Sequence, residues 1–427
     1  MTTLRDVAAL AGVSAMTVSN VVNGREDKVS ESTAERVRAA IDELGYVPNA
    51  QARALAGASS RLIALVYPVP GDGPALGGGH ASVFVGACER ACQEVDHTLM
   101  LCSTRGADGP VRPEELRDRL RAWNVAGVIV LGGVPPSLRP RLAELEVPLV
   151  LIDDYGGETT DDAEGAGGAG GADEPARGQA PGPDRGAEGA ELSADLRAED
   201  GGGLRVNIDD LGGGRQAGER IAGLGHRAVA VVGPLGVGSP VVAARLRGLR
   251  EAMGAVARPA GQGPGAPGGL IELIDVPDGF EEGVRAGQEL GDRAVAARAA
   301  GAESGHEPPV TAVFATSDVL ALGVVAGLRR AGLEVPREVS VVGFDGFEVS
   351  TYCDPPLTTV CQPIGDKAAR AVGLLVDQGA GRSARVVLPV SWREGGTLAP
   401  APQPQPSPEP GRRAARSPQS DGRQARR

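Results

Sequence analysis

The feature that most constrains the fold is an alternation of short β-branched runs with helical stretches, which begins at Arg61. Ten runs have the length and composition of buried strands, and they begin at Leu62, His97, Ala126, Val147, Leu204, Arg227, Leu270, Thr311, Val339 and Ala384. Between most of them lie stretches with helical periodicity, at 84–95, 113–124, 213–224, 241–255, 280–291 and 320–331. This alternation predicts an α/β fold with parallel sheets covered by helices on both faces. Ten strands in two groups of about five predict two lobes.

Polar residues follow several of these runs, and they are His80, Asp153, Asp154, Asp209, Asp210, Ser317, Asp318 and Asp345. Ligands of parallel sheets bind beyond the carboxyl ends of the strands, and two lobes bring such ends together across a cleft. Carboxylates and hydroxyls suit a polyol, because each sugar hydroxyl both donates and accepts. Taken singly, each aspartate is more simply explained as a turn residue or a helix cap.

Residues 1–47 predict three short helices. The first ends at Gly12, and after a tight turn Ser14 can cap a second helix whose valines face inward. A third helix runs from about Ser30 to Gly45. Two short helices joined by a tight turn and supported by a third form a helix-turn-helix, whose second helix can enter a DNA major groove. An ordinary three-helix packing unit is the alternative.

An alanine-rich segment follows at 48–59 and is too short to be a stable helix by itself. Such a segment can be coil when free and helical when bound. Leu55 has nothing apparent to pack against locally, so it can act as an apolar wedge in the minor groove. The segment is therefore interpreted as a hinge between the headpiece and the body of the chain.

Two further segments have compositions that cannot form a packed core. Residues 155–205 are rich in glycine and carry twelve acids against four arginines, a net charge of −8 out of −12 for the whole chain. Residues 399–427 are rich in proline and arginine. We expect a disordered acidic insertion and a disordered basic tail. Since most of the acidity belongs to the insertion, the negative net charge does not exclude DNA as a partner.

The stretches LRDVAALAGVSAMTVSNVVNG and VSESTAERVRAAIDELGYVPNAQARALAG resemble the headpiece and hinge of the lactose/galactose repressor family of bacterial transcription regulators. The resemblance implies that Ala15, Met16 and Asn20 read bases. It places Leu55 at the hinge leucine, and it implies further DNA contacts from Ser14, Thr17, Ser19, Asn23 and Arg53. Residues 1–57 carry six basic and seven acidic side chains, so we expect weak non-specific binding and a need for two headpieces.

The segments RLRGL, TAVFATSDVLALG and VSVVGFDGFE resemble the effector-binding core of the same family, which is similar to periplasmic sugar-binding proteins. The resemblance implies an effector pocket lined by His80, Arg245, Phe280, Ser317 and Asp345. Family members cross between lobes three times. We therefore expect the effector-binding and dimerisation domain at 60–398, with the first lobe at about 60–153 and 358–380 and the second at about 204–357 and 383–398. The insertion would then lie at the first crossover.

Other classes of protein fit the sequence less well. The five cysteines form no CxxC pair and the four histidines no metal-binding motif, so we expect neither a metal nor a cofactor. GxSxG and HExxH are absent, which argues against an enzyme. No apolar run reaches the ~20 residues of a membrane helix, and the N-terminus has no signal-peptide pattern. A secreted sugar-binding protein would leave the helix-turn-helix unexplained, so we expect a cytoplasmic protein.

The sequence thus predicts a DNA-binding repressor whose affinity for a pseudo-palindromic double-stranded operator is switched by a small molecule, with a sugar favoured. A trigger that is a nucleoside or a partner protein stays open. The tail offers proline, glutamine and arginine in place of apolar heptads, so a homodimer is expected and not a tetramer.

Overall fold

The computed structural model describes residues 2–22, 25, 28–46, 60–69, 79–106, 109–132, 137–155, 203–236, 239–256, 270–300, 310–377 and 384–402. The predicted hinge at 48–59, nearly all of the predicted insertion and all but the first residues of the predicted tail lie outside these ranges. None of the helices within them combines the length and the apolar composition that a membrane crossing requires.

The N-terminal headpiece consists of α1 (Leu4–Ala11), α2 (Ala15–Val22) and α3 (Glu31–Leu44). Its core is made of small apolar side chains, and Val7, Val18 and Val37 are completely buried. A capping box between Thr3 and Asp6 starts α1, and Gly12 ends it in the left-handed conformation at φ 64°. The three predicted helices and the tight turn are confirmed.

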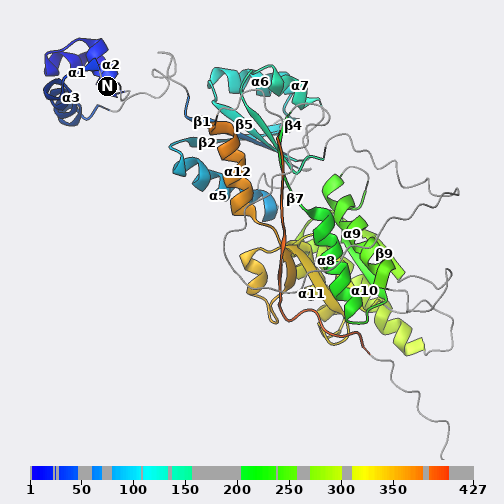
Figure 1. Cartoon of the computed structure of the whole chain (residues 1–427). Helices are drawn as coiled ribbons and strands as arrows, with labels where there is room; N and C mark the ends of the chain where they lie inside the picture. Colours follow the sequence, from blue (N-terminus) through cyan, green and yellow to red (C-terminus); the bar gives the residue numbers. More distant parts are fainter. Residues whose placement is uncertain are drawn as a thin grey trace, which may run out of the picture.

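The first sheet is parallel throughout, in the order β13-β7-β6-β5-β1-β2 (Figure 1). Its strands are β1 (Leu62–Tyr67), β2 (Thr98–Ser103), β5 (Gly127–Leu131), β6 (Leu149–Ile152), β7 (Leu204–Ile208) and β13 (Ala384–Leu388). Alternate side chains of β1 point to opposite faces. Ile63 and Leu65 pack toward α5 (Gly79–Glu94) and α12 (Ile364–Val376), whereas Ala64 and Val66 pack toward α6 (Pro113–Ala122) and α7 (Leu138–Ala143). A pair of two-residue strands, β3 (Arg105–Gly106) and β4 (Gly109–Pro110), forms a separate ribbon.

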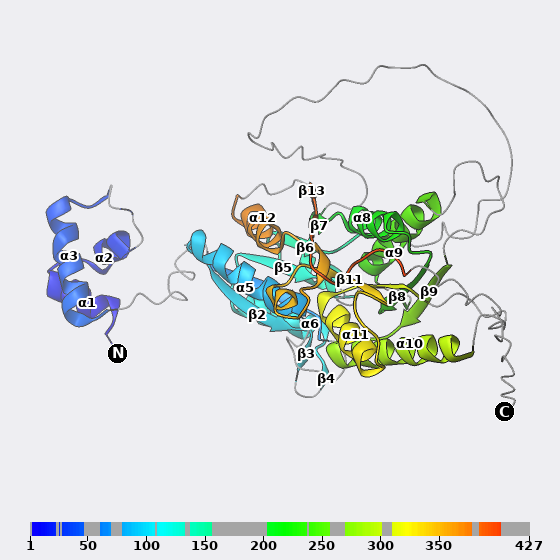
Figure 2. The ribbon, with the colours of Figure 1, turned by 90° about the horizontal axis from the view of Figure 1, so that it is seen from below.

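The second sheet has the order β14-β12-β11-β10-β8-β9, and only β14 runs antiparallel to its neighbour. Its strands are β8 (Ala228–Gly233), β9 (Leu270–Asp275), β10 (Ala312–Ala315), β11 (Ser340–Asp345), β12 (Thr358–Cys361) and β14 (Ser391–Arg393). One face is covered by α8 (Asp210–Gly223) and α9 (Pro240–Val256), the other by α10 (Phe280–Ala300) and α11 (Asp318–Arg330). A short 3-10 helix, η3 (Glu348–Thr351), follows β11. The two layered lobes are seen from a second direction in Figure 2.

All ten predicted strands are present, but two of them, β7 and β13, belong to the other lobe than predicted, and so does β12, which was not predicted as a strand. The strands β7 and β13 pair within the first sheet, and β12 pairs within the second. The predicted lobe boundaries at 204, 358 and 383 are therefore wrong. The chain crosses between lobes after β7, after β12 and after β13, which keeps the expected number of crossings. Because β6 and β7 are neighbours in one sheet, the predicted acidic insertion connects two strands of the first lobe and not the two lobes.

The helix pairs of the second lobe pack backbone against backbone at glycines. A Cβ added at Gly214 of α8 would lie 1.9 Å from the carbonyl oxygen of Arg245 in α9, and one at Gly248 would lie 2.0 Å from that of Leu211. The helices α10 and α11 pack in the same way, backbone against backbone, at Gly323 and Gly327. Glycine-rich stretches that would weaken an isolated helix are thus the reason that these helices approach closely.

Candidate functional site

The exposed end of α2 carries the predicted DNA-contacting residues. The Ser14 hydroxyl accepts a hydrogen bond of 3.1 Å from the backbone N–H of Thr17 and so caps the helix. Met16 is 70% exposed, Ala15 is also exposed, and Asn20 is half-buried. Val18 and Val21 anchor the opposite side of the helix in the headpiece core, so these outward residues are held on a rigid support.

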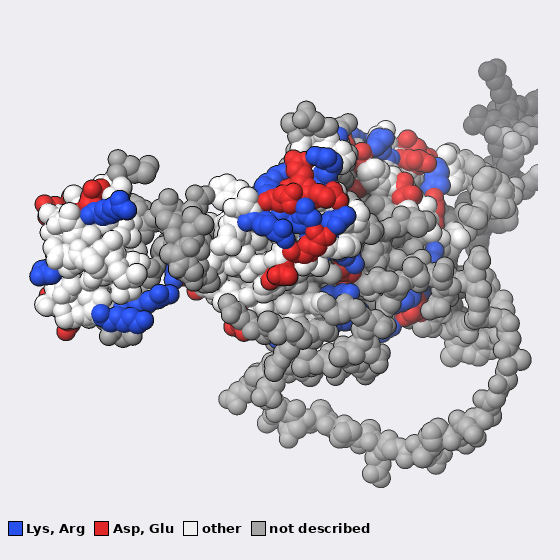
Figure 3. All heavy atoms as spheres, turned by 90° about the horizontal axis from the view of Figure 1, so that it is seen from above, with Lys and Arg blue, Asp and Glu red and all other residues white. Residues whose placement is uncertain are grey.

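The remaining residues that are predicted to contact DNA are only partly placed. Thr17 and Ser19 are half-buried on α2, whereas Asn23, Arg53 and Leu55 lie outside the described residues. The headpiece face seen in Figure 3 is mostly uncharged, with basic groups toward its edges. This agrees with the near-neutral charge of the segment and favours contact through a few hydrogen bonds over a broad basic patch.

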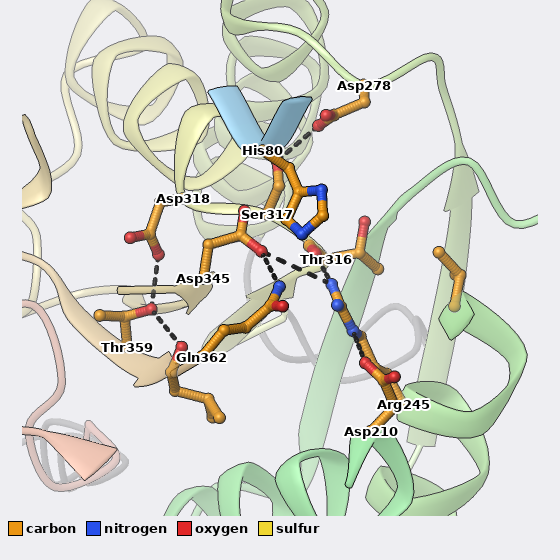
Figure 4. A network of polar contacts seen from close by, with 12 residues as sticks. His80, Asp210, Arg245, Asp278, Thr316, Ser317, Asp318, Asp345, Thr359 and Gln362 are labelled. Carbon is orange, nitrogen blue, oxygen red and sulfur yellow. Dashed lines mark hydrogen bonds and ion pairs between the residues drawn. The ribbon is translucent and has the colours of Figure 1, made fainter. Parts of the chain in front are cut away.

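Arg245 lies at the centre of a buried polar cluster in the second lobe (Figure 4). Its Nε donates a hydrogen bond of 2.7 Å to Asp210, and its Nη1 donates one of 2.6 Å to the carbonyl of Thr316. The guanidinium lies over the Phe344 ring at 3.6 Å from the centroid. Burial raises the pKa of Asp210 despite the adjacent cation.

Asp345 ends β11 and faces Arg245 at 4.0 Å. Its backbone has a φ of 128°, which is strained for a residue with a side chain. The amide of Gln362 donates a hydrogen bond of 2.6 Å to its carboxylate. Burial raises the pKa of Asp345 well above its usual value, and Asp318 and Asp278 add to that effect. Asp345 is thus a buried carboxyl group at the end of a strand, and Arg245 neutralises it only in part. Such a group is suited to bind a ligand hydroxyl.

Ser317 caps α11 through a hydrogen bond of 3.2 Å from the backbone N–H of Leu320, and its hydroxyl donates to Asp278 (Figure 4). Its neighbour Asp318 accepts hydrogen bonds from the Phe347 backbone and from Thr359, which is a structural role. Asp209 likewise serves as a helix cap, since it accepts a hydrogen bond of 2.7 Å from the backbone of Gly212. The simpler explanation, as caps and turn residues, therefore holds for Asp209 and Asp318.

The first lobe adds a second group of polar side chains. His80 lies in the first turn of α5, and Asp153 follows β6 with a φ of 55°. Both contact the ammonium of Lys367 in α12, at 3.2 Å and 3.0 Å. Lys367 also donates a hydrogen bond of 3.1 Å to Gln362, which in turn binds Asp345. A continuous hydrogen-bonded chain thus connects the two lobes.

The sequence prediction missed Lys367, Gln362 and Asp278 as members of this cluster, whereas Asp210 was among the polar residues expected at the strand ends. Lys367 had a detectable signal, because it lies at a core position of an amphipathic helix between Ile364 and Ala371. Gln362 follows β12, the β-branched strand that the sequence analysis did not identify.

Phe280 is not brought into the cluster. It begins α10 with its side chain 42% exposed, and within the described ranges no contact connects it to Arg245 or Asp345. Its role in an effector pocket stays a prediction. A hollow of about 290 Å³ lies elsewhere, in the first lobe, lined by Thr104, Pro110, Val111, Arg112, Pro113, Leu116, Ser137 and Leu138. Across the part of the chain that the structure describes, no three His, Cys, Asp or Glu side chains are placed to hold a metal.

A helix-turn-helix joined to two α/β lobes with a polar cluster between them defines a class of protein, the transcription regulators that respond to a small ligand. The family model described as bacterial regulatory proteins, lacI family, matches residues 3–49, and a periplasmic binding protein-like domain matches residues 219–398. The chain belongs to the LacI family of bacterial transcriptional regulators.

Individual relatives agree with this assignment along almost the whole chain. The HTH-type transcriptional regulator CelR of Thermobifida fusca is 34% identical over 90% of this chain and 94% of its own length. The ribose operon repressor of Escherichia coli (strain K12) is 29% identical over 88% of this chain and 92% of its own length. These relatives are DNA-binding regulators.

Solved structures match as well. The CelR-cellobiose complex has a TM-score of 0.55 and 29% identity, and the match covers 93% of this chain and 100% of that one. A lac repressor dimer bound to operator has a TM-score of 0.65 and covers 93% of this chain and 99% of that one. At 24% identity, the second match shows the shared fold.

Proposed function

We propose that this chain is a dimeric repressor whose affinity for a pseudo-palindromic operator is changed by a sugar bound between its two lobes. The observation that carries the proposal is the hydrogen-bonded chain from Asp153 through Lys367 and Gln362 to Asp345, because both lobes contribute to it. A ligand that replaces part of this chain binds both lobes at once. Its differential affinity for two lobe arrangements then sets how far operator binding changes.

The chemistry of the cluster supports a polyol. Asp345 and Asp153 supply acceptors, and Arg245 and Gln362 supply donors, all of them buried or nearly so. Each sugar hydroxyl can satisfy one donor and one acceptor of such a set. The solved CelR structure with cellobiose, 29% identical to this chain, adds support for a sugar.

The headpiece supports sequence-specific binding with few direct base contacts. Ala15 and Met16 offer apolar surface suited to a thymine methyl group, and Asn20 can bind adenine bidentately. Ser14, Thr17, Ser19 and Asn23 are assigned to the phosphate backbone, and Arg53 is expected to add a further DNA contact. With so little direct readout, we expect a flexible central pyrimidine–purine step in the operator to matter although no side chain hydrogen-bonds it.

Fluorescence anisotropy of a labelled fragment from the protein's own promoter region, at fixed salt, tests the proposal. We expect the full-length chain to bind this fragment at least 10³-fold more tightly than a scrambled one. At least one sugar from a panel containing cellobiose and ribose should change that affinity tenfold or more and raise the melting temperature.

Two outcomes would contradict different parts of the proposal. If no promoter fragment binds with or without metabolites, the DNA-binding function is wrong. If adenosine or guanosine changes the affinity and no sugar does, the regulator is retained and the sugar assignment is wrong.

A further inference from the structure

Lys367 is a charged residue with no exposed surface. Its ammonium lies 3.0 Å and 3.1 Å from the two oxygens of Asp153, 3.1 Å from Oε1 of Gln362 and 3.2 Å from Nε2 of His80. It also lies 5.7 Å from the centroid of the Phe84 ring. A lysine ammonium has three donors and no acceptor. Every polar atom that faces it can therefore serve only as an acceptor.

This requirement fixes the orientation of Gln362. Its Oε1 must face Lys367, so its amide nitrogen faces the opposite way, toward Asp345, at 2.6 Å from the carboxylate. Side-chain amides are otherwise free to turn by 180°, because their two ends are nearly the same size. Lys367 removes that freedom, and through Gln362 it presents a donor to the carboxylate of the second lobe.

The same requirement fixes the tautomer of His80. Its Nε2 faces Lys367 and must accept, so the proton of the neutral ring is on Nδ1. The ring stacks on Phe84 at a centroid distance of 6.1 Å, which holds its plane. Lys367 and the stacking on Phe84 thus define both the tautomer and the plane of the ring, with Nδ1–H as its donor.

The charged groups around His80 keep the ring neutral. Burial lowers the pKa of His80 to about 3, and Lys367 and Arg245 act in the same direction, against Asp153 and a hydrogen bond with Gln362. Cys88 on the same helix is uncharged, because burial raises the pKa of its thiol. Lys367 is thus the cation closest to the ring, and Asp153 is the anion closest to it, with Nε2 at 3.8 Å from the carboxylate.

We propose that Lys367 is a positioning residue of the effector site, which sets the tautomer of His80 and the amide orientation of Gln362. The site then presents the Nδ1–H of His80 as a donor, so it selects an effector with an acceptor oxygen at this point and discriminates against an ammonium group. This inference rests on the proposed function for the identity of the site. The tautomer and protonation state of His80 can be measured without effector or DNA.

The alternative is that Lys367 only neutralises Asp153 and contributes to the stability of the first lobe. A purely structural ion pair would leave the state of His80 unchanged when lysine is replaced. Long-range ¹H–¹⁵N correlation spectra of the full-length chain labelled in its histidines distinguish the two roles, with the His80 signals assigned by His80→Gln.

In the unsubstituted chain we expect His80 as the Nδ1–H tautomer, with no protonation between pH 8 and pH 5.5. Lys367→Met removes the donor and leaves Asp153 beside the ring, so His80 should become the Nε2–H tautomer or take up a second proton in that range. Lys367→Arg retains donors and should preserve the original spectrum. Asp366→Asn, on the exposed side of α12, should also leave it unchanged.

Three results would overturn the proposal. They are an Nε2–H ring in the unsubstituted chain, titration of that ring near the ordinary value of about 6.5, and an unchanged His80 spectrum in Lys367→Met. The first two need no variant, so they decide the question even if Lys367→Met does not fold. Operator binding with sugars is a separate measurement, and its failure would count against the proposed function alone.

Discussion

Asp345 shows at the level of one residue how a candidate binding site is kept at a cost in stability. Its carboxyl group is 4% exposed, its φ is 128°, and its cation Arg245 is shared with Asp210. Burial raises its pKa well above the usual value. The folded chain therefore holds a proton at a pH where the unfolded chain has lost it, and stability declines as pH rises from about 4 toward the folded-state pKa.

Asp345→Asn should accordingly raise the free energy of unfolding at pH 7.5 and change that free energy little at pH 4. The neutral amide oxygen still accepts the hydrogen bond from Gln362, while the cost of burying a charge is removed. We expect a gain of about 1–2 kcal/mol, or a few degrees in melting temperature. Thermal melts at the two pH values measure this gain, and equal destabilisation at both would contradict it. In the same variant, the response of operator binding to the effector should be about tenfold or more weaker. A factor of ten corresponds to ~1.4 kcal/mol.

At the level of elements, the position of Arg245 depends on how closely α8 approaches α9. The contact is made at Gly214, whose hydrogen occupies the space where a Cβ would meet the backbone of Arg245 itself. Arg245 has no freedom to readjust independently, because its guanidinium is bound to Asp210 on α8 and to the Thr316 carbonyl. Helix spacing and site geometry are therefore coupled.

Gly214→Ala should displace α9 and both destabilise the chain and weaken the effector response. The new Cβ would lie 1.9 Å from a carbonyl oxygen, and overpacking of this kind costs about 1–3 kcal/mol. Gly223→Ala, in the same helix, is the matched control, because nothing lies within 4 Å of its Cβ position. That control should stabilise by roughly 0.5–1 kcal/mol. Denaturant unfolding compares the two, and similar effects from both would refute the packing argument.

The hinge is an element whose contribution is tested through DNA. Leu55 lies outside the described residues, so its role as a minor-groove wedge rests on the sequence. Leu55→Ala should weaken operator binding by about 10²-fold and non-specific binding far less, since only the specific complex gains from unstacking a base step. Competition binding with operator and scrambled fragments measures both affinities. Equal losses in the two would rule out the wedge.

At the level of the whole molecule, the three crossings explain how one ligand site can move both lobes. The chain changes lobe after β7, β12 and β13, and Asp210 and Gln362 follow the first and second crossing strands directly. A change in the hydrogen bonds of these residues therefore acts at the junction of the lobes. Two-state switching needs such a shared element, which both ligand and DNA binding can bias.

Light scattering of the full chain at micromolar concentration tests the predicted assembly. We expect a mass of two chains, because the arginine- and proline-rich residues 403–427 lack the apolar heptads of a helical tetramerisation segment. A mass near four chains would refute the dimer.

Because the headpiece is nearly neutral, the logarithm of the operator affinity should fall only with a shallow slope as the logarithm of the salt concentration rises.

Much of the cluster could be anticipated from local patterns. Arg245, Ser317 and Asp345 were identified because they belong to recognisable motifs or follow predicted strands, and the structure brings these three into one cluster. Lys367 was missed because a lysine in an amphipathic helix is usually solvated. Only the tertiary structure shows that this one is buried beside the acceptors Asp153 and Gln362. Phe280 matched a motif but lies exposed at the start of α10.

The sequence by itself determined most elements of this protein, though not β12, since the periods of 2 and 3.6 residues and the caps at Thr3 and Ser14 are local properties of the chain. Only the tertiary structure decided which lobe each crossing strand joins. The β-branched runs of β7, β12 and β13 fit either sheet equally well, and their place depends on backbone hydrogen bonds to strands far away in the sequence. The orientation of His80 and Gln362 has the same origin, because it is set by a lysine that packing alone brings between them.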